Sequence, residues 1–192
     1  DTGTSSGGGS GSAEAEPFFV GLLTVDGGGA VGDVDVMNVI STNTEPESGN
    51  LTSNLLTGLN MGSGIAYSAL EILNIDLSDA ANTFTIESTH AGSTNLATSV
   101  GRDIINVQTI AGLTTVTSGD DNDTINIGSL APAVGGDVNG ISALLTLIGG
   151  ADMDTLNVDD TGDTDPNAGN LTATRLTGLG MGDADQSVVN SS

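Results

Sequence analysis

One three-residue pattern recurs along the chain and limits what the chain can fold into: an apolar residue, then Asn or Thr, then another apolar residue. Successive side chains of a β-strand point to opposite faces, so this alternation is typical of a strand with one buried face. Six copies predict six such strands around an apolar, largely aliphatic interior. The copies are Met37-Asn38-Val39, Leu73-Asn74-Ile75, Phe84-Thr85-Ile86, Ile105-Asn106-Val107, Ile125-Asn126-Ile127 and Leu156-Asn157-Val158.

The spacing of these strands indicates how they are connected. Gly, Asp, Asn and Ser clusters separate them, and a strand is expected about every ten residues. Antiparallel hairpins also fit this rhythm, but a coil of short parallel strands would stack like residues on like residues. The nearest candidate for a helix, 66–73, continues into the strand-like segment NIDL. We therefore predict an all-β, right-handed parallel β-solenoid, similar to a β-helix or β-roll. Its asparagines either form an internal hydrogen-bonded ladder or face water.

A longer repeat divides the chain into two unequal parts. Residues 169–182 (GNLTATRLTGLGMG) repeat residues 49–62 (GNLTSNLLTGLNMG), with ten of fourteen positions identical. The offset 170 − 50 = 120 defines a unit of about 120 residues, which is typical of a repeat architecture. Since the second copy stops soon after Met181 and the chain begins with Asp1, we expect a processed piece of a longer array.

The repeat and the composition together predict the organisation of the chain. Residues 1–17 are rich in Gly and Ser and are expected to form a flexible N-terminal arm. The β-solenoid is expected over 18–182, with a full unit at 18–139 and a partial second copy at 140–182. Residues 183–192 are expected to form a C-terminal tail.

The charge of the chain excludes several classes of partner. Twenty-five Asp and Glu residues stand against two Arg and no Lys, for a formal net charge of −23 at pH 7. Nucleic acids and anionic membranes are bound through cationic groups, so neither is expected as a partner. The longest apolar run, 18–25, is too short to insert across a bilayer. Divalent cations are the natural counter-charge.

Pairs of aspartates at positions i and i+2 precede three of the predicted strands, in the turns GDVDVMNV, SGDDNDTINI and GGADMDTLNV. Such turns present carboxylate and carbonyl oxygens to a hard cation such as calcium. The alternative is a set of solvated turn residues that bond their own backbone. The candidate calcium ligands are Asp33, Asp35, Asp121, Asp123, Asp152 and Asp154.

Two of these turns resemble the nonapeptide of RTX, or hemolysin-type calcium-binding, repeats, G-G-x-G-x-D-x-(large apolar)-x. The matching residues are Gly149, Gly150, Asp154 and Leu156 in one turn, and Gly119, Asp123 and Ile125 in the other. Aspartates replace the third glycine of the motif, and the two nonapeptides are isolated rather than tandem. The longer unit resembles the β-strand repeats of very large secreted bacterial proteins. These resemblances imply a secreted or cell-surface bacterial protein that binds calcium.

A further candidate cation site is DTDPNAGN at 163–170. Its oxygen-bearing side chains, Asp163, Asp165 and Asn167, alternate as they do in calcium loops. The following glycine stands one place later than an EF-hand requires, and the terminal bidentate glutamate is missing. The alternative is an acidic surface loop.

Catalysis is not expected from this sequence. His90 is the single histidine and there is no cysteine, so any hydrolytic triad would depend on this one imidazole as its base. We predict instead a structural extracellular protein whose ends recruit further copies, head to tail, into a filament or matrix stabilised by calcium. The first alternative is a spacer or stalk module of a giant bacterial adhesin. The second is a β-helix that cleaves polysaccharides with paired acidic residues.

Overall fold

The structure is a computed structural model and describes residues 21–29, 32–182 and 188–190. Within these residues it contains β-strands and no helix, so the all-β prediction is confirmed. The predicted arm at 1–17 and most of the predicted tail at 183–192 lie outside the described residues. The strands are β1 (Leu23–Asp26), β2 (Val36–Ile40), β3 (Ser48–Leu51), β4 (Leu55–Gly58), β5 (Ile65–Ser68), β6 (Ile72–Asp76), β7 (Thr83–Ile86), β8 (Ser93–Ala97), β9 (Ile104–Val107), β10 (Thr114–Thr117), β11 (Thr124–Ile127), β12 (Leu145–Ile148), β13 (Thr155–Val158), β14 (Gly169–Leu171), β15 (Arg175–Gly178) and β16 (Val188–Asn190).

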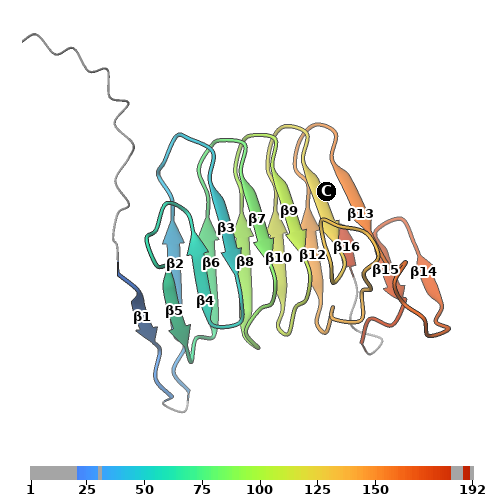
Figure 1. Cartoon of the computed structure of the whole chain (residues 1–192), viewed down its shortest axis with the longest axis horizontal. Coiled ribbons are helices and arrows are strands. Elements are labelled where there is room, and N and C mark those ends of the chain that lie inside the picture. The colour runs from blue at the N-terminus through green and yellow to red at the C-terminus, as the bar shows by residue number, and fades with distance from the viewer. Residues whose placement is uncertain (1–20, 30–31, 183–187, 191–192) are drawn as a thin grey trace, which may run out of the picture.

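The strands form two eight-stranded mixed sheets that extend along the long axis of the molecule (Figure 1). Sheet A has the order β1-β5-β4-β3-β7-β9-β11-β13, and sheet B has the order β14-β15-β16-β12-β10-β8-β6-β2. From β6 to β13, successive strands alternate between the two sheets. Each strand from β8 to β13 pairs in parallel with the strand two places before it in the chain.

The repeated segment departs from the parallel pairing that we predicted. In the first copy, β3 pairs antiparallel with β4, and β4 pairs antiparallel with β5. The second copy folds in the same way, with antiparallel pairs β14·β15 and β15·β16. Residues 52–54 alone connect β3 to β4, and so short a connection cannot make the crossover that parallel neighbours need. The prediction of parallel strands throughout 18–182 is therefore wrong for these segments, where the sheets are mixed.

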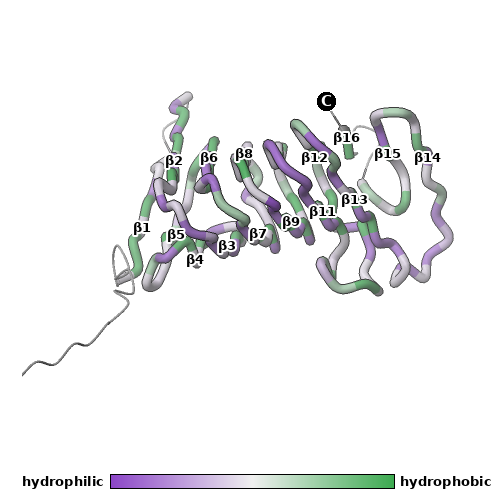
Figure 2. Tube along the Cα trace, turned by 90° about the horizontal axis from the view of Figure 1, so that it is seen from above, coloured by the Kyte–Doolittle hydropathy of each residue, from purple (hydrophilic) through white to green (hydrophobic). Residues whose placement is uncertain are grey.

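The core lies between the two sheets and consists of side chains stacked in register. Phe84, Ile105 and Ile125 lie on neighbouring strands of sheet A and are almost fully buried. In β7 and β11, buried and half-buried residues alternate, as the three-residue pattern predicts. Removing such a side chain from water stabilises the fold by about 1.5–3 kcal/mol. Figure 2 shows the two rows of strands from above, with hydrophobic residues reaching β1 and β2 at one end.

The five asparagines of the pattern, together with Asn95, form two hydrogen-bonded ladders on the faces turned away from the core. In both ladders the amide Nδ2 of the later strand donates to the Oδ1 of the earlier strand, at 2.7–2.9 Å. The structure thus differs from both alternatives, because the asparagines bond to one another but do so on the outer faces and not inside the core. Sheet B carries Asn38, Asn74 and Asn95, and sheet A carries Asn106, Asn126 and Asn157.

Candidate functional site: acidic turns and open sheet edges

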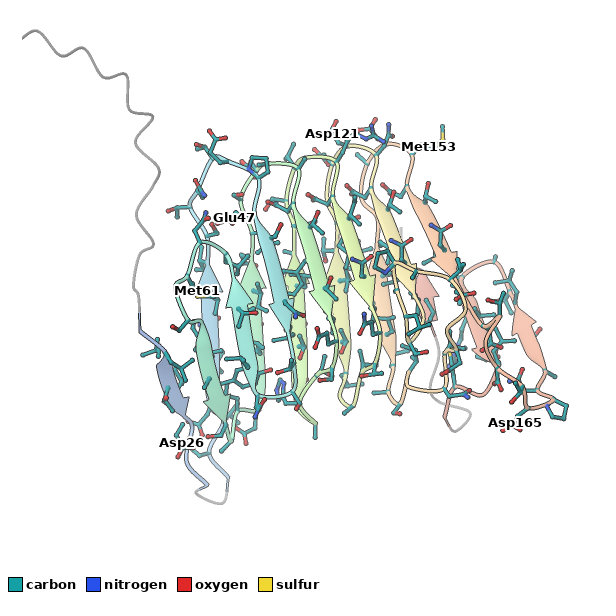
Figure 3. All side chains as sticks on the ribbon, in the orientation of Figure 1. Asp26, Glu47, Met61, Asp121, Met153 and Asp165 are labelled. Atoms are coloured by element: carbon teal, nitrogen blue, oxygen red, sulfur yellow. The ribbon has the colours of Figure 1, made fainter. Side chains whose placement is uncertain are left out.

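The structure brings four of the predicted aspartates together across turns. The Asp121 backbone N–H donates to Asp152 Oδ2 at 3.3 Å, and the Asp123 N–H donates to Asp154 Oδ1 at 3.0 Å. The turn before β11 therefore stacks on the turn before β13. Asp121 and Met153, from these two turns, lie at the same edge of the molecule (Figure 3).

These contacts belong to a longer row of side-chain oxygens, here called the carboxyl ladder. It comprises Glu47, Asn82, Asp103, Asp123 and Asp154, which precede β3, β7, β9, β11 and β13 in sheet A. The backbone N–H of each member donates to a side-chain oxygen of the next, at 2.7–3.0 Å. A backbone N–H that is buried without a partner is costly, so the ladder satisfies the donors that precede each strand.

Three members of the carboxyl ladder are buried with one carboxylate oxygen left without a partner. Glu47 is 5% exposed, and its Oε2 has no hydrogen-bond partner among the described residues. Asp103 and Asp123 are each 1% exposed, and the Oδ2 of each has no hydrogen-bond partner among the described residues. Burial raises the pKa of the Asp103 carboxyl to about 6, because desolvation disfavours its charged form. Burial also raises the pKa of Asp123. A proton or a cation at these oxygens would relieve the desolvation cost.

The sequence analysis missed Glu47, Asn82 and Asp103. A signal for Asp103 was present, because it stands two residues before Ile105-Asn106-Val107, just as Asp123 stands two residues before Ile125. The pattern of two acids within one turn does not include these residues. The property that the members share is one oxygen-bearing side chain at a fixed position before each strand.

Asp33 and Asp35 lie apart from the carboxyl ladder, in the turn before β2 of sheet B. The Asp35 N–H donates to Glu71 Oε2 at 2.7 Å, and the Val34 N–H donates to Asp33 Oδ1 at 3.0 Å. Partial burial, followed by repulsion from Asp33 and Glu71, raises the pKa of Asp35. As in the carboxyl ladder, a backbone N–H of one turn donates to a carboxylate of the turn before the neighbouring strand.

The loop at 163–170 is held by its own hydrogen bonds. The Asp165 N–H donates to Asp163 Oδ1 at 2.8 Å, and Asn167 Nδ2 donates to Asp163 Oδ2 at 2.6 Å. Both oxygens of Asp163 are therefore engaged within the loop, as in the turn-residue alternative. Asp165 lies at the far end of the molecule from Asp26 (Figure 3).

The described residues contain no group of three or more His, Cys, Asp or Glu side chains positioned to hold a metal ion. The pairs Asp121/Asp152 and Asp123/Asp154 bring two carboxylates each to neighbouring turns. Calcium binding at these pairs stays a prediction. In the same part of the chain, no helix is long and apolar enough to cross a membrane.

An open depression of about 600 Å³ lies beside β11 and β13. Residues 131–134 form one wall, the strands contribute Asn126 and Leu156 among others, and Asp159 follows β13. Asp159 is the one acid among its lining residues. The paired carboxylates of most glycoside hydrolases are therefore not assembled in this depression.

The second feature of functional interest is the set of outer sheet edges. Among the described residues, no strand pairs with the outer edges of β1, β2, β13 and β14. Leu171 in β14 is 77% exposed, whereas Leu51, its counterpart in the first copy, is 0% exposed beside β7. Leu156 in β13 and Leu23 in β1 are exposed as well. Unpaired edges of this kind recruit further strands.

No protein family, curated protein or solved structure matches the chain. The resemblance to RTX repeats therefore rests on the two turn motifs alone.

Proposed function

We propose that the chain is a structural repeat protein, a right-handed parallel β-solenoid that assembles end to end into an extracellular filament or matrix. The alternation of strands between two sheets from β6 to β13 supports the solenoid. So does the stacking of like residues, such as Asn106, Asn126 and Asn157, on neighbouring parallel strands. The proposal assigns no catalytic role to the chain.

The observation that carries the assembly is the exposure of Leu171. Leu171 and Leu51 occupy the same position of the long repeat, and Leu51 is buried because β7 pairs beside it. A strand added to β14 would bury Leu171 in the same way, for a gain of about 1.5–3 kcal/mol. At the other end of the molecule, the edge strands β1 and β2 run in the same direction as the other parallel strands of their sheets.

The charge of the chain supports a role for cations in this assembly. Copies that each carry −23 repel one another, and physiological salt screens this repulsion only beyond about 8 Å. Contact between two ends therefore needs bound counter-charge. The aspartate pairs of the stacked turns supply oxygen ligands of the kind that calcium prefers. We propose that calcium bound there stabilises the turns and lowers the repulsion.

A stalk module of a large bacterial adhesin is the second candidate. In the first copy, the chain's own β6 and β7 cover the strands that correspond to β13 and β14. A further repeat within the same polypeptide would cover those edges as well as a second molecule does. In that case isolated molecules would act as spacers and would not polymerise.

Electron microscopy and sedimentation velocity of the purified chain test the proposal. Both are carried out at high protein concentration, with millimolar calcium and again after chelation. We expect thin uniform filaments that dissolve on chelation. Filaments that persist after chelation would retain the structural role and contradict the role of calcium. Monomeric rods in both conditions would contradict assembly and favour the stalk.

A further inference from the structure

The two sheets end at different positions along the long axis of the molecule. β7 and β8 are consecutive in the chain and mark one level of the stack. Beyond this level toward β1, sheet A has four further strands and sheet B has two. Toward β14, sheet A has three further strands and sheet B has five. Sheet A therefore projects by two strands at one end, and sheet B projects by two strands at the other (Figure 1).

The two steps are complementary in height and direction. Each step is about 10 Å, because neighbouring strands are about 4.8 Å apart. The four edge strands also run in the common direction of their sheets, because two antiparallel pairings flank each of the reversed strands β4 and β15. A second molecule shifted along the axis therefore fills both steps at once. If the second molecule were instead rotated by half a turn about the long axis, the projecting strands β14 and β1 would meet. Strands β13 and β2 would then remain apart.

We propose that copies of this chain join head to tail with sheet A continuing sheet A and sheet B continuing sheet B. In this junction β13 of one molecule pairs in parallel with β1 of the next, and β14 pairs with β2. The inference rests on the proposed end-to-end assembly and specifies its register.

The inward side chains match at the junction of β13 and β1. In β13, Leu156 and Val158 continue the buried stacks of β11. In β1, Leu23 and Val25 pair with the buried residues Ile65 and Tyr67 of β5. Pairing β13 with β1 therefore sets Leu156 beside Leu23, and Val158 beside Val25.

The outward side chains of the same pair also match. The alignment sets Asn157 beside Thr24 of the next molecule. An Asn–Thr pair of this kind already exists within the chain, where Asn106 Nδ2 donates to Thr85 Oγ1 at 3.2 Å between β9 and β7. The junction would thus continue the outer polar row of sheet A.

The chain itself shows what a strand beside β14 must provide. In the first copy, Gly49 of β3 faces Phe84 of β7, whose ring fills the space beside the glycine. Gly169 is the counterpart of Gly49, and a side chain at this position would meet Leu179 rather than an aromatic ring. The edge of β14 therefore requires a large apolar side chain opposite Gly169.

Strand β2 of a second molecule meets this requirement. Met37 is turned toward the core beside Leu73 and would lie opposite Gly169. The same register sets Val39 beside Leu171, and Asn38 beside Asn170. Since Asn38 is the first rung of the asparagine ladder in sheet B, Asn170 would extend that ladder across the junction.

One contact of this register is unfavourable. Asp159, which follows β13, would lie beside Asp26 at the end of β1. Within the chain the corresponding position pairs Ile40 with Asp76 instead. Like charges placed directly opposite each other across a strand pair are destabilising. The junction would therefore form more readily when cations or protons neutralise this pair.

Disulfide cross-linking tests the register, since the chain has no cysteine of its own. The variant Thr24→Cys/Asn157→Cys places one thiol at each end, on the outer face. We expect oxidation of its filaments to give a series of disulfide-linked multimers on a non-reducing gel. The matched control is Thr24→Cys/Asn170→Cys, which would cross-link efficiently only if sheet A met sheet B.

The outcomes separate the register from the assembly. Multimers from the control variant instead would overturn the proposed junction and leave end-to-end assembly intact. Filaments that neither variant cross-links would also overturn the junction. Absence of filaments in the unmodified chain, together with absence of cross-links, would overturn both proposals.

The acidic contact has its own test. Asp26→Asn removes one facing charge but retains an Oδ1 that can accept from the Gly28 N–H. We expect the calcium concentration at half-maximal assembly to fall at least threefold. The matched control is Asp76→Asn, which makes the same change of net charge at the end of the internal strand β6. Equal shifts for the two variants would contradict a facing pair at the junction.

Discussion

The acidic residues of this chain differ in the partners of their carboxylates. Asp103 is buried and leaves one oxygen without a partner among the described residues. Asp159 instead accepts from the Thr161 hydroxyl and from the Gly136 N–H, and these hydrogen bonds lower its pKa. The two aspartates therefore affect the pH dependence of stability in opposite directions.

The raised pKa of Asp103 predicts a protein that is more stable in mild acid. Its folded-state pKa of about 6 lies above the ordinary value of 3.8, so the folded chain binds more protons between these values. Stability is therefore gained as the pH falls from 7 toward 4. We expect a higher urea midpoint at pH 5 than at pH 7, and a smaller difference in Asp103→Asn. Asp159→Asn is the contrasting variant, since it should lose stability at pH 7. An unchanged pH profile in Asp103→Asn would contradict the assignment.

Phe84 should be among the most costly side chains to truncate. It is 0% exposed and packs against Gly49, which cannot fill the space that the ring would leave. We expect Phe84→Ala to lower the free energy of unfolding by about 3–5 kcal/mol, measured by urea denaturation. Val134→Ala, at an 81% exposed position, should change it by less than about 0.5 kcal/mol. Similar losses in the two variants would be inconsistent with this core.

At the scale of strands, sequence periodicity predicted the apolar stacks because alternation follows directly from strand geometry. The copy Ile125-Asn126-Ile127, for example, lies in β11 and needed no further information. The direction of β4 (LLTG) and β15 (RLTG) was missed, because such short segments do not indicate which neighbouring strand they pair with. Asp103 and Asn82 were missed for a related reason. Each bonds to a turn 20 or more residues away, and single-turn motifs do not report such contacts.

The two antiparallel hairpins give a matched prediction at this scale. Gly58 and Gly178 have φ values of 81° and 82°, and a Cβ there would overlap the carbonyl oxygen of Ser48 or Ala168 respectively. We expect Gly58→Ala, inside sheet A, to lower global stability by about 1–3 kcal/mol. Gly178→Ala, near the open edge of sheet B, should mainly increase hydrogen exchange over 169–178. Equal global losses would mean that the end hairpin unfolds together with the centre.

At the scale of the molecule, the exposed leucines of the ends should affect assembly and not folding. We expect Leu171→Asp to leave the urea midpoint unchanged and to abolish filaments in electron micrographs, because the charge would be buried at the junction. Leu113→Asp is the control, since Leu113 is 58% exposed but precedes the internal strand β10. Filaments formed by Leu171→Asp would contradict a role for β14.

The equal strand number of the two sheets predicts the axial repeat of the filament. Each sheet contributes eight strands per described molecule, so each added copy advances the assembly by eight strand spacings, about 38 Å. Fibre diffraction or power spectra of filament images should show this period. A markedly longer period would mean that one or both steps are left unfilled.

The stepped ends also have a mechanical meaning. At the position where one sheet passes from one molecule to the next, the other sheet is an uninterrupted run of strands within a single chain. The two molecules therefore overlap along the axis. A plane that separates two molecules in one sheet therefore crosses the interior of a single chain in the other sheet, where backbone and hydrogen-bonded strands are continuous. Tilting one molecule against the next would require the two projecting strands of one sheet to slide across the neighbouring molecule. A fibre jointed in this way would resist bending at its seams nearly as well as within its subunits.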